Sequence, residues 1–478
     1  MLASPRRGIG WPLGVAVASG APAMVLVAAV PIAQLAGPPS VLVWGIAAVL
    51  GFVMAVVFAE LASAFPDQGG GVAVLAAQMF GRKRRFLARL GQWSYWLGWS
   101  PAMALSAGLI GEYIHAAVAP GTTPWLAWLA AGLLLALSAA VNTLGIKVCG
   151  RVQLVLAAAV IAAVALLTVL PLVNGVSDPA ALTPFAPPDG WASGEGVSAI
   201  LGAFFLAAWS AYAAEIALTY APEHAEGVRT AVRSLLATGA AMVVVCVILP
   251  LALFTTIGSG TAAQASSTIA VFQGGASPFG AAVVAAVTIA VLVLGVNTVA
   301  VGDSRLLCQM ARNGDAWAPL GRLNARGVPR NALVFDVAAN AAFLALAVLV
   351  TGGSVSAVPL TLLVAANVGY LTSLNLALVA AWLLRRERAA SSVCFRAPRC
   401  CMTAGLAIAA FNLLLVLGAG AAWGWGNAAL GVALLAAVMA ALCAPWRRWV
   451  SARPGLGRFQ RRRPATTSRP RRRGSRAA

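Results

Sequence analysis

Residues 200–218 read ILGAFFLAAWSAYAAEIAL, an apolar stretch in which Glu215 is the single charged residue. A helix of about 20 apolar residues crosses the hydrocarbon core of a membrane, which is roughly 30 Å thick. A carboxylate inside such a span costs about 2.5 kcal/mol or more to insert, so Glu215 should face protein or water. The stretch predicts a transmembrane helix whose acid is either a structural carboxylate bonded to a neighbouring helix or a gate or protonation site.

Apolar stretches of similar length recur along the rest of the chain. With 61% hydrophobic and 10% charged residues, the chain differs from soluble proteins, in which about a quarter of the residues are charged. We predict an all-α polytopic membrane protein with twelve transmembrane helices. The expected spans are 9–36, 40–64, 91–118, 124–142, 152–173, 196–219, 231–257, 278–302, 331–351, 357–384, 402–421 and 425–444.

The connections between these spans alternate between basic and charge-poor segments. If Arg6 and Arg7 are cytoplasmic, all 33 Lys and Arg residues lie on the cytoplasmic side. The charged residues of the longest outer connection, 174–195, are all acidic. Because basic loops stay in the cytoplasm, the pattern predicts that both termini are cytoplasmic. Arg outnumbers Lys 31 to 2, which suggests a GC-rich bacterial genome and therefore the bacterial inner membrane.

Residues 446–478 contain twelve Arg residues and no acid, so they carry more than half of the net charge of +20. Together with Pro, Gly and Ser, this composition is typical of a disordered segment. A basic cytoplasmic segment is attracted to the anionic lipids of the inner leaflet. We therefore divide the chain into a membrane domain, 1–445, and a disordered cytoplasmic tail that contacts lipid and not nucleic acid.

The sequence lacks the residue patterns that most enzymes and cofactor sites need. It has two His residues, His115 and His224, and seven Cys residues without a paired CxxC spacing. It also has no Gly-rich phosphate-binding loop and no set of nucleophile, His and acid. We expect no metal, no cofactor, no catalytic residue and no pumping driven by ATP. The oligomeric state stays open.

Two of the expected spans contain residues that interrupt a helix. Residues 19–22 of the first span read SGAP; proline removes a backbone donor, and glycine tolerates almost any backbone conformation. Residues 209–212 of the sixth span read WSAY. The first and sixth spans each begin a group of five spans. Because five is an odd number, the second group crosses the membrane in the opposite orientation to the first. Broken helices at matching positions of two inverted halves predict a transport site near mid-membrane.

Three motifs carry a resemblance to a known family. Residues 58–61 read FAEL and are followed by FPDQGGG at 65–71. The sixth span contains FFLAAWSAYAAE at 204–215, and SRLL, ARNGD, LN and GVP follow within 304–329. In this order and spacing, the motifs resemble those of the amino acid–polyamine–organocation (APC) superfamily permeases. The resemblance covers nearly the whole membrane domain.

The resemblance implies a five-plus-five inverted repeat, about 9–173 and 196–384, with two extra helices at about 402–444 and transport by alternating access. It implies that the opened backbone of helices 1 and 6 binds an amino acid, and free peptide groups at half-helix ends suit its carboxylate and ammonium. Trp209 matches the aromatic residue that covers the substrate, and Glu215 matches an acid near the inner gate. The implied binding residues are Ser19, Gly20, Ala21, Pro22 and Ala23 in helix 1 and Trp209, Ser210, Ala211 and Tyr212 in helix 6.

Side-chain selectivity should come from the inward faces of helices 3, 6, 8 and 10. We place no acid except Glu215 at mid-membrane, so a neutral amino acid is favoured over a dicationic polyamine. The coupling partner is a proton or a counter-substrate. Export or antiport of cationic amino acids or amines stays an alternative, as does a non-transporting sensor or scaffold that acts through its tail. The candidate side chains are Tyr95, Trp99, Met103, Asn297, Asn367 and Tyr370.

Some positions depart from the pattern of the family or leave their role open. The first span lacks the Gly-Ser-Gly run that many members use to bind a carboxylate, and 152–170 lacks the Lys of some proton-coupled members. Glu60 and Asp303 lie at inner ends of spans, where we expect each to pair with an Arg of an inner loop. Glu112 and His115 predict a polar cap or a pH-sensitive pair near the outer end of the third span.

Overall fold

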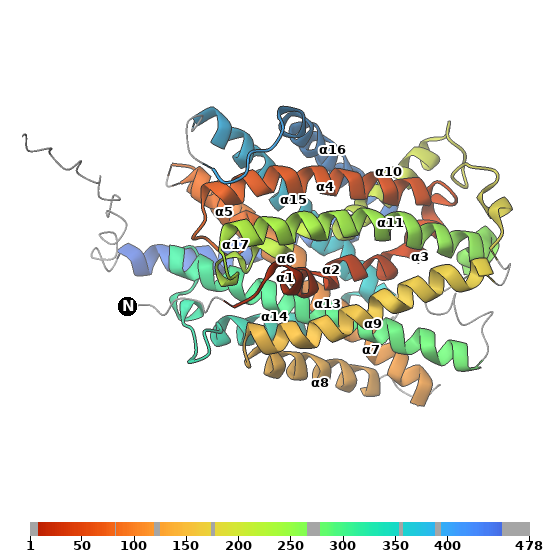
Figure 1. Ribbon diagram of the computed structural model, residues 1–478, viewed down its shortest axis with the longest axis horizontal. Coiled ribbons are helices and arrows are strands. Elements are labelled where there is room, and N and C mark those ends of the chain that lie inside the picture. Colours follow the sequence, from red (N-terminus) through yellow and green to blue (C-terminus); the bar gives the residue numbers. More distant parts are fainter. Residues whose placement is uncertain are drawn as a thin grey trace, which may run out of the picture.

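The computed structural model consists of helices and connecting loops wherever it describes the chain (Figure 1). An amide in lipid has no water to bind, so apolar segments form helices, which satisfy their own backbone groups. The chain is therefore an all-α polytopic membrane protein, as predicted. The described residues are 8–81, 83–118, 125–173, 177–264, 278–352, 357–387 and 393–451.

Each expected span coincides with at least one helix. Among the described residues, seven helices are long and apolar enough to cross a membrane, and three shorter apolar helices accompany them. The count of twelve crossings and the inverted repeat stay predictions. In chain order the helices are α1 (Trp11–Ala18), α2 (Gly20–Ala23), α3 (Val25–Ala36), α4 (Ser40–Ala64), α5 (Val72–Phe80), α6 (Arg85–Trp99), α7 (Pro101–Val118), α8 (Trp125–Asn142), α9 (Ile146–Val173), η1 (Pro179–Leu182), α10 (Gly194–Ala211), η2 (Ala213–Leu218), η3 (Ala221–Glu223), α11 (Val228–Gln264), α13 (Pro278–Asn313), η4 (Ala318–Gly321), α14 (Arg330–Val350), α15 (Ala357–Glu387), α16 (Arg399–Trp423) and α17 (Trp425–Ser451), in which η marks a 3₁₀-helix.

The first expected span is divided into α1, α2 and α3. The regular helix is interrupted at Ser19 (φ −67°, ψ −15°) and at Met24 (φ −65°, ψ −8°), both of which keep dihedral angles close to helical values. The two interruptions flank Pro22, whose ring removes a donor and crowds the preceding turn. The first span is thus interrupted but not unwound.

The sixth expected span changes its helix type at Tyr212. The α-helix α10 ends at Ala211, Tyr212 has φ −88° and ψ −5°, and the 3₁₀-helix η2 follows with Glu215 inside it. A 3₁₀-helix winds more tightly than an α-helix, and a stretch of it within a longer helix often marks a hinge. The change of type therefore places a candidate hinge next to the acid that the sequence singled out.

The interior of the bundle is built from α10, α13 and α15, which are mostly buried, whereas only a third or less of the spanning part of α14 and α16 is buried. Helix α15 packs along α6, and α10 packs against α3 and α4. Figure 1 shows the short helices α1 and α2 in the middle of the bundle. The interrupted spans therefore lie in the protein interior, where a broken helix is tolerated.

Ion pairs tie together the connections that we predict on the cytoplasmic side. Glu60, at the end of α4, pairs with Arg385 at the end of α15, with a shortest N–O distance of 2.5 Å, as predicted. Asp315, after α13, pairs with Arg89 of α6 at 3.2 Å. The predicted loops 2–3, 8–9 and 10–11 therefore meet at one end of the bundle, and the exposed pair Arg84–Glu387 (3.4 Å) joins the same end.

Candidate functional site

The interrupted first and sixth spans contact each other at the level of their breaks. The hydroxyl of Ser210 donates a hydrogen bond to the carbonyl oxygen of Ala21 at 3.3 Å. Ser19 turns its hydroxyl back to a carbonyl of its own helix, 2.7 Å away. The backbone of Pro22 and Ala23 is helical, but their side chains lie outside the described part of the chain. Of the implied binding residues, the structure brings Ala21 and Ser210 together.

Gly20 lets α2 lie directly against α13. A Cβ atom on Gly20 would come within 2.3 Å of the hydroxyl of Thr298 and within 2.5 Å of the carbonyl oxygen of Leu294. The hydroxyl of Thr298 donates to the carbonyl oxygen of Val17 at 2.8 Å, and the amide of Gln153 on α9 donates to the same carbonyl at 3.2 Å. Side chains from two neighbouring helices thus satisfy a carbonyl group just before the break.

Glu215 is bound by three aromatic side chains from two other helices. Tyr95 of α6 donates a hydrogen bond to one carboxylate oxygen. Tyr370 of α15 and Trp99 of α6 donate to the other oxygen, at 2.8 and 3.2 Å. The side chain is buried, as expected from the cost of placing it in lipid. Tyr95, Trp99 and Tyr370, which we had proposed for selectivity, therefore surround the acid beside the break.

Two glycine residues explain why α6 and α15 converge on Glu215. A Cβ atom on Gly98 would lie 2.7 Å from the Cα atom of Tyr370, and one on Gly369 would lie 2.8 Å from the carbonyl oxygen of Ser94. Small residues at a helix crossing let the two backbones approach closely. The crossing brings the aromatic residues next to these glycines within hydrogen-bonding distance of the carboxylate.

Trp209 links the sixth span to α6 just before the break. Its indole is fully buried, and Nε1 donates a hydrogen bond to the carbonyl oxygen of Gly98 at 2.9 Å. The centroid of its ring lies 5.5 Å from that of Trp99. The indole therefore lies beside the cluster around Glu215, and its bond to Gly98 connects it to the crossing of α6 and α15.

Comparison with known proteins identifies the family. A family model described as "Amino acid permease" matches residues 9–445. The chain belongs to this family. It is therefore a membrane transporter of amino acids and not an enzyme, in agreement with the resemblance seen in the motifs. A search of the curated proteins found no match.

In this permease we expect Trp209→Ala to reduce amino acid uptake at least tenfold while the protein still inserts into the membrane. The change removes a buried indole and creates a cavity that costs about 3–5 kcal/mol. Uptake into proteoliposomes and thermal unfolding measure the two effects. A matched control is Trp423→Ala, because Trp423 makes the same kind of bond, to the carbonyl oxygen of Gly202 at 2.9 Å, at a less buried position. Equal losses of uptake in both variants would contradict a special role for Trp209.

Other candidate residues of the permease contact helices away from the breaks. The sulfur of Met103 lies 3.8 Å from the amide nitrogen of Asn340 on α14. The amide oxygen of Asn297 accepts hydrogen bonds from Ser138 and Asn142 of α8, both at 3.0 Å. Both side chains therefore have partners outside the first and sixth spans, and their contact with substrate stays a prediction.

The remaining candidates of the sixth and tenth spans are buried near the break. Asn367 donates a hydrogen bond from its side chain to the carbonyl oxygen of Phe205. The hydroxyl of Tyr212 is buried and has no hydrogen-bond partner in the described part of the chain. Ala211 ends α10 and is also buried. The unpaired hydroxyl of Tyr212 is the polar group nearest in sequence to the hinge.

The sequence analysis overlooked one buried acid and gave the wrong partner for another. Asp336 of α14 is fully buried, and its Oδ1 accepts hydrogen bonds from Trp96 and Ser100 at 2.8 and 2.7 Å. Asp336 could have been found from the sequence in the same way as Glu215, because it is also an acid inside an apolar span, where a carboxylate is costly unless it faces protein or water. Asp303 was expected to pair with an Arg; instead, neither of its carboxylate oxygens has a hydrogen-bond partner among the described residues. Asp303 and Asp336 therefore join Glu215 as buried acids of the helical bundle.

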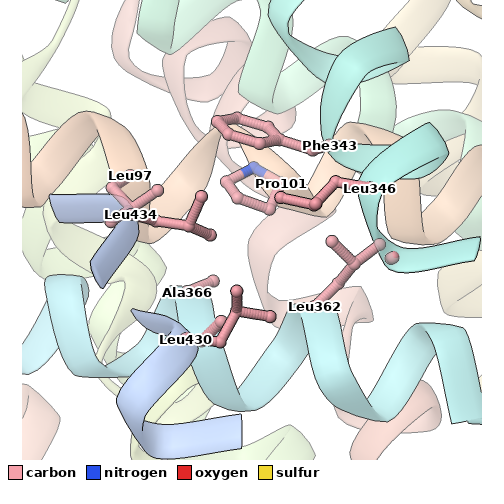
Figure 2. Close-up of a pocket in the computed structure, with 10 residues that line it drawn as sticks. Leu97, Pro101, Phe343, Leu346, Leu362, Ala366, Leu430 and Leu434 are labelled. Carbon is pink, nitrogen blue, oxygen red and sulfur yellow. The ribbon is translucent and has the colours of Figure 1, made fainter. Parts of the chain in front are cut away.

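A hollow elsewhere in the permease is unsuited to an amino acid. Figure 2 shows Leu97, Pro101, Phe343, Leu362 and Leu434 around it, contributed by helices α6, α7, α14, α15 and α17. The lining side chains carry no polar group that could bind a carboxylate or an ammonium.

The side chains of Glu112 and His115, our candidate outer pair, lie outside the described part of the chain.

Proposed function

We propose that this permease moves neutral amino acids across the cytoplasmic membrane by alternating access, coupled to protons or by exchange. The observation that carries the proposal is the contact between Ser210 and Ala21, because it joins the two interrupted spans at their breaks. Peptide groups near Ser19, Met24 and Tyr212 depart from regular α-helix and could bind the carboxylate and ammonium of a substrate.

The proposed inverted halves, 9–173 and 196–384, would move against each other around this contact. On this proposal the cluster of Tyr95, Glu215 and Tyr370 acts as the inner gate. Opening the gate requires η2 to separate from α6 and α15, which breaks the hydrogen bonds to the carboxylate. Until the substrate is enclosed, the hydrogen bonds from these aromatic side chains to the carboxylate keep the gate closed.

The polar groups near the breaks favour a substrate with one ammonium group. Glu215 accepts three hydrogen bonds from its own protein, and Oδ1 of Asp336 accepts two. These occupied oxygens offer little to a second positive charge on a substrate. Oδ2 of Asp336 and both carboxylate oxygens of Asp303 have no hydrogen-bond partner among the described residues, and they offer little to such a charge when the acids are protonated. On this proposal, peptide groups near the breaks would bind the carboxylate and the ammonium of a neutral amino acid, which, unlike a polyamine, needs no further charged partner.

A binding screen followed by transport tests the proposal. Purified permease should be stabilised against heat by at least one neutral amino acid among the twenty, and reconstituted permease should accumulate or exchange the same compound. Failure of both assays across the whole panel would contradict the proposal. Displacement of a bound neutral amino acid by arginine or agmatine would instead favour antiport or export of cationic compounds.

A further inference from the structure

Asp303 is a buried acid without a partner. It lies on α13, its side chain is 1% exposed, and neither carboxylate oxygen has a hydrogen-bond partner in the described part of the chain. Buried polar groups are nearly always hydrogen-bonded, so an exception of this kind requires an explanation. An ionised carboxylate in this position would cost several kcal/mol, because nothing in its surroundings replaces the lost water.

The titratable groups that act electrostatically on Asp303 are acidic or neutral. They are Glu215 on η2, Asp336 on α14 and Tyr95 on α6, and each interacts electrostatically with Asp303 or its acidic neighbours. The nearest cation along α13 is Arg305, which forms a bidentate pair with Glu223 at 2.5 and 3.3 Å. The positive charge of Arg305 is therefore already balanced, and no described base faces Asp303.

The arrangement does not suit a metal cation as a partner for Asp303. Hard cations need several oxygen ligands that converge on one point, and the described residues contain no group of three or more His, Cys, Asp or Glu side chains that could hold a metal ion. A single proton removes the charge of the carboxylate without any further ligand. The geometry thus points to the protonated acid.

The position of Asp303 connects this proton to the hinge. Its neighbour Gly302 faces η2. A Cβ atom added to Gly302 would lie 3.3 Å from Ile216 and 3.5 Å from the hydroxyl of Thr219. Helix α13 therefore approaches the segment that contains Glu215 closely at Gly302. A negative charge on Asp303 would repel Glu215 and favour the separation of α13 from η2.

We propose that Asp303 is a proton-binding site of the transport cycle: it is protonated in this closed conformation and releases its proton when α13 and η2 separate and water enters. Protonation converts the carboxylate to the neutral acid, which removes the repulsion from Glu215 and permits closure. This inference rests on the proposed transport function and adds the coupling ion and its site.

Infrared spectroscopy tests the proton site without any transport. Purified permease is titrated with acid and base, and the carbonyl band of a protonated carboxylic acid is compared between the natural protein and Asp303→Asn. We expect this band to lose intensity in Asp303→Asn and to be retained in Asp303→Glu. Asp67→Asn is the control, because it removes an exposed carboxylate and should leave the band unchanged. A band that is unchanged in Asp303→Asn, with Asp303→Glu folded, would overturn the proposal.

Proton movement in proteoliposomes tests the role of the site in transport. A mixture of the twenty amino acids is added outside vesicles that contain a pH-sensitive dye, and the ratio of protons to labelled amino acids taken up is measured. We expect this ratio to fall at least tenfold in Asp303→Asn and to be kept in Asp67→Asn, which removes an exposed carboxylate. An unchanged ratio in Asp303→Asn, or uptake driven by sodium instead of protons, would overturn the inference. Absence of any uptake or exchange by the natural protein would count against the proposed function, and the infrared result would then decide the proton site.

Discussion

Glu215→Gln should fold normally and change the pH dependence of transport, whereas Glu215→Leu should fail to form a stable protein. A Gln side chain can keep all three hydrogen bonds. Its oxygen accepts from Tyr370 and Trp99, and its NH₂ group donates to Tyr95, whose hydroxyl rotates to become an acceptor. A Leu side chain leaves three buried donors unpaired, at about 1–3 kcal/mol for each.

Uptake into proteoliposomes over a range of external pH measures the first effect, and thermal unfolding of the purified variants measures the second. Tyr370→Phe is a useful comparison, because it removes one donor and leaves the ionisable acid in place. If Glu215→Gln transports with the same pH profile as the natural protein, Glu215 is a structural carboxylate and not part of the gate.

The sequence was sufficient to predict where the helices are and which of them are interrupted. Apolar runs dictate helices in lipid, and Pro22 and the stretch before Glu215 mark the two irregular spans. The cost of a carboxylate in lipid also predicts that Glu215 is buried in protein. These inferences depend on local composition, which a single sequence displays directly.

The partners of the buried acids could not be predicted in the same way. The donors to Glu215 come from α6 and α15, and they meet it because Gly98 and Gly369 allow a close helix crossing. Nothing in the spacing of one span identifies the residue opposite it in another. The same limit explains why Asp303, next to a basic loop in sequence, was expected to pair with an Arg of that loop. In the structure the nearby Arg305 pairs with Glu223 instead.

A buried ion pair lies at the end of the bundle that we predict to be cytoplasmic. Glu223 and Arg305 are both at least nine-tenths buried and form two hydrogen bonds. The backbone of Gly8 donates to the carbonyl oxygen of Glu223 at 2.9 Å, so the N-terminal segment lies against the pair. Burial lowers the pKa of the adjacent His224 to about 4, so this His is neutral at physiological pH and adds no charge to the ion pair.

Arg305→Met is expected to destabilise the permease by about 3–5 kcal/mol, because it leaves the carboxylate of Glu223 buried without its counter-charge. The double variant Arg305→Met with Glu223→Leu should recover most of this loss, since neither charge then remains. Arg84→Ala is the matched control: its pair with Glu387 is half exposed, and such pairs contribute about 0–1 kcal/mol. Denaturant or thermal unfolding of the variants measures the differences. A single variant as stable as the double one would show that the buried carboxylate of Glu223 costs no stability without its counter-charge.

The double variant also separates stability from gating. Cys308 lines a hollow beside Arg305 and Glu223 and is 6% exposed, so its thiol reports access from the inner side. In a background without the thiols of Cys394, Cys400 and Cys401, we expect a small thiol reagent to label Cys308 at least several-fold faster in the double variant than in the parent. Apolar side chains can restore the packing energy of the pair, but they cannot restore its directional bonds between α13 and η3. Faster labelling at restored stability would therefore assign the ion pair to the closure of the inner gate, and unchanged labelling would limit it to folding.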